Sequence, residues 1–369
     1  MNYSEALLFT GKCLSLSFSP ERTGEIRDEI RSGSVEWEQV VWVSTGQFVF
    51  SALYIRLERA GLLPEIPSEL AEYMKEFTGL NRDRNQQIML QALEITELLN
   101  NNEITPVFLK GTAHLLDGLY EDIAERQVGD IDLLVAESEM VRAAEILIAS
   151  GYMAQTPYNP NDFKVTKHYP RLLNYSRVAA VEVHRQVLGY PADKALDCRL
   201  LIEKARKPDL PVTAYVLCDE HQIVFNVLHT QITHGDFYFG AINIRQGYDL
   251  FLLSQRTNPL EAVKRVGSYF NRMNCNLALT SKILGNPVML NYKSTLQTKL
   301  YLGRISRHIH YPKWERFSHV ILYLIQRFSN YMRKLIQATY DKNSRDSLLA
   351  RLSDPDWYVQ HLKSYKEIY

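Results

Sequence analysis

The chain has 369 residues, with 46% hydrophobic and 23% charged side chains, which excludes a disordered or fibrous protein. This length accommodates one catalytic core with helical additions. Lysine plus arginine and aspartate plus glutamate each total 42, so the formal charge of zero provides no overall attraction to nucleic acid or to an acidic membrane.

Cysteine usage and hydropathy indicate the cellular compartment of the protein. The four cysteines are scattered without a CxxC pair, which indicates thiols in a reducing compartment and neither a disulfide framework nor a zinc knuckle. Residues 1–30 lack the charged head and apolar run of an export signal. No stretch approaches the roughly 20 apolar residues of a membrane-spanning helix. We therefore expect a cytoplasmic protein without a transmembrane segment.

Helical periodicity dominates residues 1–100, which we interpret as an N-terminal helical region. Apolar positions recur at helical spacing in Val40–Leu62 and again in Ile88–Leu99. The proline-containing stretch Leu63–Ser68 interrupts the pattern, and Ser68 with Glu72 suits a new helix start.

The pattern changes over residues 101–215, where strands and helices alternate. We predict strands over 105–109, 131–135, 171–175 and 178–187, the last two as a hairpin around Ser176-Arg177, and helices over 112–120 and 139–149. Such alternation indicates a small α/β sheet. Residues 216–369 return to helical patterns and are predicted to form a C-terminal helical domain, with helices over 221–229, 245–254, 260–284 and 317–339.

The segment Gly129–Val135 carries the most informative motif. Side chains alternate across a strand, so Asp130 and Asp132 share one face while Ile131 and Leu133 take the other. Two adjacent carboxylates repel each other unless a cation lies between them. Because hard oxygen ligands favour Mg²⁺ or Mn²⁺, the pattern indicates a metal site.

The same alternation recurs at Val181–His184, where Glu182 and His184 share the polar face. A third carboxylate on a neighbouring strand completes an arrangement for two metal ions. One ion would lower the pKa of an attacking hydroxyl, and the other would stabilise departing pyrophosphate. The candidate metal ligands and catalytic residues are therefore Asp130, Asp132 and Glu182, and His184 is a candidate nucleotide contact.

A candidate phosphate site precedes these acids at Lys110-Gly111-Thr112, where a buried strand turns into a helix. Glycine lets backbone approach a ligand closely, and the N–H groups at a helix start attract anions. Thr112 adds a hydroxyl donor and Lys110 a point charge, while Arg126 is placed to contact a phosphate or to pair with an acid. Taken alone, the D-x-D pattern is also typical of a solvated strand end, and Lys-Gly after a strand is also typical of a plain turn. The order of these motifs along the chain favours a catalytic site.

These residues carry a family resemblance. Phe108-Leu109-Lys110-Gly111, Tyr120, Arg126 and Gly129–Val135 resemble the bacterial uncharacterised nucleotidyltransferase family of the polymerase-β superfamily, and Val181–His184 resembles its third-carboxylate strand. The resemblance covers residues 60–255. It implies an α+β fold in which a small mixed sheet, the nucleotidyltransferase core, is flanked by N-terminal and C-terminal helical regions.

The resemblance also implies a reaction: Mg²⁺-dependent (or Mn²⁺-dependent) transfer of a nucleoside monophosphate from an NTP, expected to be ATP, to an acceptor hydroxyl. By this resemblance the three acids hold the metal, with Glu182 also helping to activate the acceptor. Gly111 and Thr112 hold the triphosphate, with Lys110 beside them. Where the wider superfamily has Gly-Ser, this chain has Gly111-Thr112.

Several alternatives stay open at this stage. The acceptor is unidentified and can be a small molecule, a peptide or protein, or an RNA end. A catalytically inactive binding module with the nucleotidyltransferase fold is a second hypothesis, and an RNA-modifying toxin or defence protein is a third. The locally basic, aromatic-rich segment 299–337 suits contact with a polyanion, or simply a helical domain whose acids lie elsewhere.

Other polar residues receive structural interpretations. His229 and His234 lie off one helical face, so we expect polar packing and not a zinc pair. For His168 the default is a solvated loop, with a ligand contact as the alternative suggested by Lys164, Lys167 and Arg171 nearby. Arg245 and Asp249 are spaced as a pair on a helix surface, to which we assign no chemistry.

Overall fold

The computed structural model describes residues 1–18, 20–160, 163, 166–189, 192–233, 235–310 and scattered positions between 321 and 349. Two compact units are present, Met1–His310 and Tyr311–Tyr369. The predicted domain boundaries at residues 100 and 215 both fall inside the first unit. The division into two units does not test them, so they stay predictions. Among the described residues, no helix combines the length and apolar character needed to cross a membrane.

A six-stranded mixed sheet lies at the centre of the first unit, in the strand order β3-β4-β5-β2-β1-β6. The pairs β2–β5 and β1–β6 are parallel, and the remaining pairs are antiparallel. The predicted mixed sheet is thus confirmed, although the edge strands β3 and β6 carried no sequence signal. The strands are β1 (Val107–Phe108), β2 (Asp130–Leu134), β3 (Met153–Ala154), β4 (Leu172–Leu173), β5 (Ala180–His184) and β6 (Tyr215–Val216).

Helices precede the sheet, as predicted, but the expected helix Val40–Leu62 is two helices. Phe48 has a backbone φ of 55°, in the left-handed region, and this conformation cannot continue an α-helix. The chain therefore turns between α3 and α4. The N-terminal helices are α1 (Tyr3–Leu14), α2 (Pro20–Arg31), α3 (Trp37–Gly46) and α4 (Phe50–Arg59).

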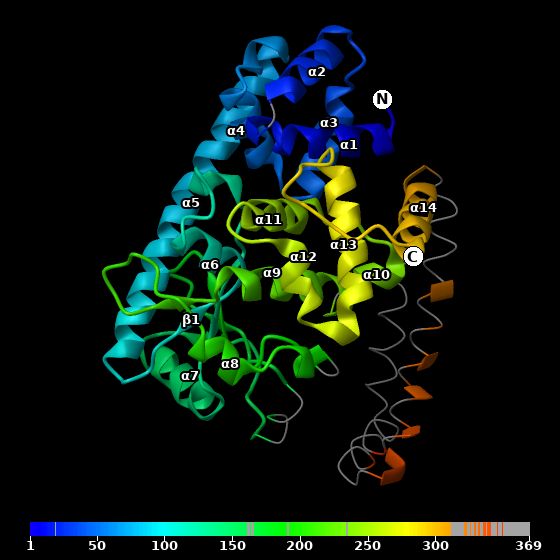
Figure 1. Cartoon of the computed structure of the whole chain (residues 1–369). Helices are drawn as coiled ribbons and strands as arrows, with labels where there is room; N and C mark the ends of the chain where they lie inside the picture. Colours follow the sequence, from blue (N-terminus) through cyan, green and yellow to red (C-terminus); the bar gives the residue numbers. More distant parts are fainter. Residues whose placement is uncertain are drawn as a thin grey trace. The chain divides into compact units, whose positions relative to one another are not determined.

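The longest helix, α5 (Ser68–Asn100), runs beside both the N-terminal helices and the sheet region (Figure 1). It begins at Ser68 as predicted, directly after Pro67. Its buried amides bond to loop carbonyls: Asn81 Nδ2 donates to Ala124 O at 2.7 Å, and Asn85 Nδ2 to Arg126 O at 2.7 Å. These amides pair backbone groups that would otherwise be buried without a partner. The helix thereby fixes the loop that leads into β2.

Short helices connect the strands. The helix predicted over 112–120 is α6 (Lys110–Leu116), which begins at the lysine and ends before Gly118, whose φ is 59°. The helix predicted over 139–149 is α7 (Met140–Ala149), and α8 (Cys198–Glu203) lies between β5 and β6. The strands predicted over 171–175 and 178–187 are antiparallel neighbours, as β4 and β5. The predicted hairpin is confirmed.

The described residues after the sheet are mainly helical, as predicted. The expected helix over 260–284 is interrupted by a 3₁₀ turn at Gly267–Tyr269. A single π-helical turn, His229–Thr233, follows α9, and such turns are frequent at functional sites. Described positions between 321 and 340 are helical. The helices that follow the sheet within the first unit are α9 (Asp219–Leu228), α10 (Asp236–Phe239), α11 (Ile244–Ser254), α12 (Pro259–Lys264), α13 (Phe270–Ile283) and α14 (Leu296–His310).

A buried ionic network joins three separate parts of this unit. Arg56 on α4 donates to Glu125 Oε2 and to Tyr248 Oη on α11, both at 2.7 Å. The Arg56 and Glu125 side chains are each 0% exposed. Tyr248 also donates to Glu125. Since removing one partner of a buried pair leaves an uncompensated charge, the network makes the N-terminal helices and α11 interdependent.

We expect Arg56→Met to lower the free energy of unfolding by roughly 3–5 kcal/mol, because Glu125 would stay buried without its counter-ion. Urea denaturation of the full chain measures this. Arg31→Met is the control, because the Arg31 side chain of the Arg31–Glu65 pair is 61% exposed, and it should leave stability unchanged. If both substitutions changed the free energy of unfolding equally, the buried network would stabilise the fold no more than an exposed ion pair does.

Candidate active site

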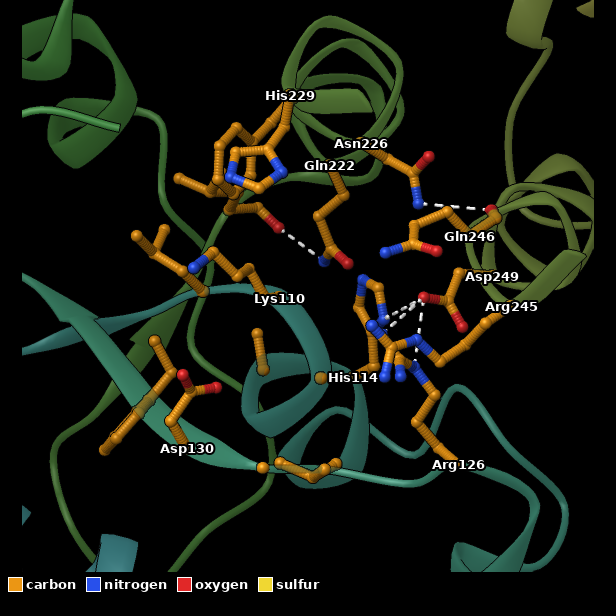
Figure 2. A pocket seen from close by; sticks show the side chains of 18 of the residues that line it. Lys110, His114, Arg126, Asp130, Gln222, Asn226, His229, Arg245, Gln246 and Asp249 are labelled. Carbon is orange, nitrogen blue, oxygen red and sulfur yellow. Dashed lines mark hydrogen bonds and ion pairs between the residues drawn. The ribbon is translucent and has the colours of Figure 1, made fainter. Parts of the chain in front are cut away.

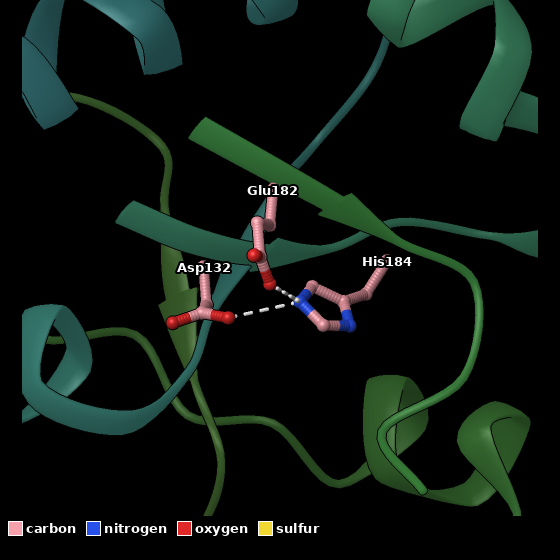
Figure 3. A group of neighbouring side chains, drawn as sticks. All are labelled: Asp132, Glu182 and His184. Atoms are coloured by element: carbon pink, nitrogen blue, oxygen red, sulfur yellow. Dashed lines mark hydrogen bonds and ion pairs between the residues drawn. The ribbon is translucent and has the colours of Figure 1, made fainter. Parts of the chain in front are cut away.

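The parallel pairing of β2 with β5 brings the predicted acids together. Asp132 is directly opposite Glu182, and Leu134 is opposite His184. The ligand atoms of Asp132, Glu182 and His184 all lie within 4.8 Å of one another (Figure 3). Carboxylates from two separate segments therefore converge, as the alternation in each strand predicts. Asp130 stands apart from this trio, and His184, predicted as a nucleotide contact, is included in it.

Asp132 is the most enclosed of the acids, at 1% exposed. Its Oδ1 accepts from Lys110 Nζ at 2.5 Å and lies 2.9 Å from His184 Nε2. Burial alone would raise the pKa of Asp132, but the hydrogen bond from His184 and the charge of Lys110 outweigh it and hold the pKa below its usual range. The carboxylate is thus ionised, with the Lys110 ammonium and the His184 ring already bound to one of its oxygens.

His184 lies between two acids. Its Nε2 is 3.4 Å from Glu182 Oε2 as well as 2.9 Å from Asp132 Oδ1. Burial lowers the pKa of His184, yet the hydrogen bonds to Asp132 and Glu182 more than offset it, so the pKa is raised overall. The bond to His184 in turn lowers the pKa of Glu182. The ring orients both carboxylates; its contact with a nucleotide stays a prediction.

Asp130 lies at the mouth of this cluster, with a side chain that is 34% exposed. Burial and the charge of Asp132 raise its pKa. Its Oδ2 is 3.7 Å from Arg171 Nη2 on the adjoining segment. Asp130 therefore remains available to a ligand that approaches from the solvent side.

Lys110 has an unusual backbone conformation, with a φ of 52°. For a side chain with a Cβ this left-handed conformation costs about 1–2 kcal/mol. Its ammonium meets Asp132, and the carboxylates raise its pKa against the effect of burial. Strained residues cluster where the surrounding structure uses them, which supports the predicted role of Lys110 in the site.

Gly111 and Thr112 follow within α6. A Cβ on Gly111 would lie 2.9 Å from Val128 Cγ2, so this glycine allows α6 to pack closely against the segment before β2. Thr112 is 1% exposed, and its hydroxyl donates to the Asp130 carbonyl at 3.0 Å. Both residues therefore fix α6 to β2. Their predicted contact with a triphosphate stays a prediction.

A cavity of about 240 Å³ opens beside Lys110 and Asp130 (Figure 2). It lies between the sheet residues and helices α9 and α11, so residues far apart in the sequence share it. Its polar lining side chains are Lys110, His114, Arg126, Gln127, Asp130, Gln222, Asn226, His229, Arg245, Gln246 and Asp249.

Arg126 pairs with an acid, one of the two roles predicted for it. Its Nη2 and Nε are each 3.1 Å from Asp249 Oδ2, and Tyr120 donates to Asp249 Oδ1 at 2.6 Å. The surface pair expected between Arg245 and Asp249 is wrong, because Asp249 is only 1% exposed and is directed at Arg126 and Tyr120. Arg245 stacks on the Phe48 ring at 4.9 Å, and burial together with the charge of Arg126 lowers its pKa to about 10.

Several site residues had no decisive sequence signal. The default of a solvated loop for His168 is wrong, because this residue pairs with His184 in the sheet and is half-buried. Burial and the charge of Lys110 lower the pKa of Lys167, against the opposing charges of Glu182, Asp132 and Asp130. His229, expected in polar packing, lines the cavity. Gln222 and Asn226 are one helical turn apart, a spacing that indicates one face but no ligand. Lys164 and His234 lie outside the described residues.

A family model described as uncharacterised nucleotidyltransferase matches residues 33–283, which is more than half of the chain. The chain belongs to this family. The matched range extends the resemblance seen in the sequence in both directions, so α3, α4, α12 and all of α13 lie within it. No curated protein matches the chain.

The nucleotidyltransferase family implies an NTP and a divalent metal, and the residues present fit both. Carboxylate oxygens of Asp132 and Glu182 are ligands of the type that Mg²⁺ and Mn²⁺ prefer, with Asp130 at the mouth of the same cluster. His184 suits the role of a neighbour that orients a liganding carboxylate. The cavity beside these acids is lined by Lys110, Arg126 and Arg245, which match a polyanionic ligand.

We expect Lys110→Met to tighten Mn²⁺ binding by roughly fivefold to tenfold, because an ammonium that competes for Asp132 is removed. Calorimetric titration of the nucleotide-free protein with Mn²⁺ measures this change in affinity. Lys264→Met is the control, since this lysine lies on the surface beside Glu261 with its side chain 47% exposed. Weaker Mn²⁺ binding in Lys110→Met would mean that Lys110 holds the carboxylate in place and does not compete with the ion.

His114 supplies a pH-dependent test. Burial lowers its pKa to about 4, so the folded protein holds it neutral. Below pH about 6.5 the unfolded chain binds a proton that the folded protein refuses, and stability falls until pH about 4. Between pH 7 and pH 4, the free energy of unfolding of His114→Gln should fall by roughly 3 kcal/mol less than that of wild type. Denaturation at a series of pH values measures the difference. Identical pH profiles for the two proteins would contradict a neutral, buried His114.

Proposed function

We propose that the protein transfers a nucleoside monophosphate from an NTP, with ATP as the expected donor, to an acceptor hydroxyl in a Mg²⁺-dependent or Mn²⁺-dependent reaction. The observation that carries this proposal is the register of β2 and β5, which sets Asp132 opposite Glu182. Lys110, which binds Asp132, and Asp130 line a cavity that also has the cationic side chains Arg126 and Arg245. Family membership supports the same reaction class.

Charge in the cavity favours a triphosphate. Lys110, Arg126 and Arg245 line it, while Asp249 pairs with Arg126. Arg245 keeps a buried Nε that has no hydrogen-bond partner among the described residues. A phosphate oxygen accepts from such a donor, and a partly enclosed site strengthens the attraction. Positioning and charge neutralisation are the main contributions an enzyme makes to this chemistry.

At the α-phosphorus the reaction breaks one bond and forms one, and a proton moves from the acceptor hydroxyl to a carboxylate. The acceptor oxygen attacks the α-phosphorus, the bond from that phosphorus to the bridging oxygen of the pyrophosphate breaks, and pyrophosphate leaves. Glu182, whose pKa is lowered chiefly by the bond to His184, is ionised and accepts the proton of the acceptor hydroxyl. When bound to Asp130, Asp132 and Glu182, a divalent ion supplies neutralising charge. Lys110 and Arg126 bind the phosphates and orient them.

We expect Asp130→Asn and Asp132→Asn each to reduce pyrophosphate release by about a hundredfold or more, because each removes negative charge at the metal site while keeping the shape of the side chain. Labelled ATP is incubated with Mg²⁺ and with small-molecule, protein and RNA fractions of a cell extract. The fraction that becomes labelled identifies the class of acceptor.

Glu94→Gln is the control, because its side chain on α5 is 52% exposed and pairs with Arg177 away from these acids. It should leave pyrophosphate release unchanged. Binding of ATP that is indifferent to Asp130→Asn and Asp132→Asn, together with no labelled fraction, would favour a non-catalytic binding module and overturn the proposed reaction.

A further inference from the structure

Helix α9 presents one continuous face to the cavity. Gln222, Phe225, Asn226 and His229 follow one another at the spacing of a helical stripe and all line it. Figure 2 shows Gln222 and Asn226 projecting from this helix toward the space above His114, on the side away from Arg126. The reaction proposed above does not use these amides.

Gln222 has an unpaired acceptor. The residue is 3% exposed, and its Nε2 donates to the Leu217 carbonyl at 2.8 Å. This bond fixes the orientation of the amide, so that the oxygen and the nitrogen are distinguished. Oε1 is buried and has no hydrogen-bond partner among the described residues. Because a buried polar atom is costly without a partner, a ligand that donates to Oε1 gains affinity there.

The surroundings of this amide suit a flat, partly apolar ligand. Phe225 and His229 form an edge-to-face pair with ring centroids 5.5 Å apart, and Leu217 and Phe108 add apolar surface. Gln246 Oε1 on α11 is also without a partner among the described residues. The cavity of about 240 Å³ is smaller than the roughly 300–1,000 Å³ of a pocket for a complete drug-sized ligand, so it suits one part of a nucleotide.

An anion does not fit at this end. Carbonyl oxygens such as Gln222 Oε1 and Gln246 Oε1 carry partial negative charge and would repel a phosphate. The cationic side chains Lys110, Arg126 and Arg245 line the same cavity and are the phosphate contacts in the reaction proposed above. Acceptor groups beside aromatic rings instead match a nucleobase that bears N–H donors.

We propose that Gln222 is a specificity-determining residue that accepts a hydrogen bond from the exocyclic amino group of an adenine base seated against α9. The inference rests on the nucleotidyltransferase function proposed above. An amide pairs naturally with adenine, because its oxygen accepts from the amino group while its nitrogen can donate to an adjacent ring nitrogen. Gln222 Nε2 keeps a second hydrogen for this purpose after its bond to Leu217.

The test compares ATP with purine riboside triphosphate, which differs from ATP only in lacking the 6-amino group. Calorimetry of the full chain with Mg²⁺ gives the two dissociation constants. We expect wild type to bind ATP at least roughly tenfold more tightly. In Gln222→Met the two nucleotides should bind equally, since the acceptor is gone while the side-chain length is kept. The ratio within one protein cancels any change in folding or in triphosphate binding.

Gln91→Met is the matched control. Gln91 is 2% exposed and its Nε2 donates to the Ala179 carbonyl at 2.8 Å, but it lies on α5 outside the cavity. It should keep the wild-type preference for ATP.

Equal binding of ATP and purine riboside triphosphate by wild type would overturn the inference and leave the proposed function standing. Tighter binding of GTP or UTP than of ATP would overturn it in the same way. So would loss of the preference in Gln246→Met but not in Gln222→Met. Failure of wild type to bind any nucleotide would overturn the proposed function and the inference together.

Discussion

The parallel pairing of β2 with β5 creates an electrostatic problem that the rest of the site solves. The register sets Asp132 beside Glu182 in a largely buried position, with Asp130 at the mouth. Like charges at this distance would destabilise the fold if they stood alone. Lys110 and His184 reduce the repulsion by sharing Asp132 Oδ1. The strained backbone at Lys110 is therefore tolerated because its ammonium stabilises the sheet it adjoins.

Residues distant from the acids hold this arrangement in place. The loop before β2 is fixed by Asn81 and Asn85 of α5, and Glu125 in the same loop is bound by Arg56 and Tyr248. Tyr248 is adjacent to Asp249, which binds Arg126 at the cavity. The N-terminal helices, α5 and α11 thus act on one loop. This explains in physical terms why the family match extends well beyond the sheet to residues 33–283.

The convergence of Asp132 and Glu182 was predictable because its cause is local. Alternation along two short strands puts Asp130 and Asp132, and then Glu182 and His184, on polar faces, and pairing of those strands does the rest. The opposite side of the cavity was not predictable, because it depends on how helices distant in the sequence pack against the sheet. Asp249 illustrates the limit: its spacing from Arg245 suggests a surface pair, whereas its partner Arg126 is 123 positions away. Strands as short as β3 and β6 likewise carry too few residues to show a period.

The two sides of the cavity carry opposite charge, because the sheet contributes acids and the segments packed against it contribute arginines. At the sheet lie the three acids Asp130, Asp132 and Glu182. Across the cavity, Arg126 and Arg245 lie close enough that the charge of Arg126 helps lower the pKa of Arg245. His114, which lines the same cavity, stays neutral because burial lowers its pKa to about 4, and so it adds no further positive charge. A triphosphate chain is anionic along its length and needs a cation at each end. In the function proposed above, divalent ions at the acids and guanidinium groups across the cavity would orient such a chain without any base-specific contact, and this would leave the uncharged amides of α9 to select the base.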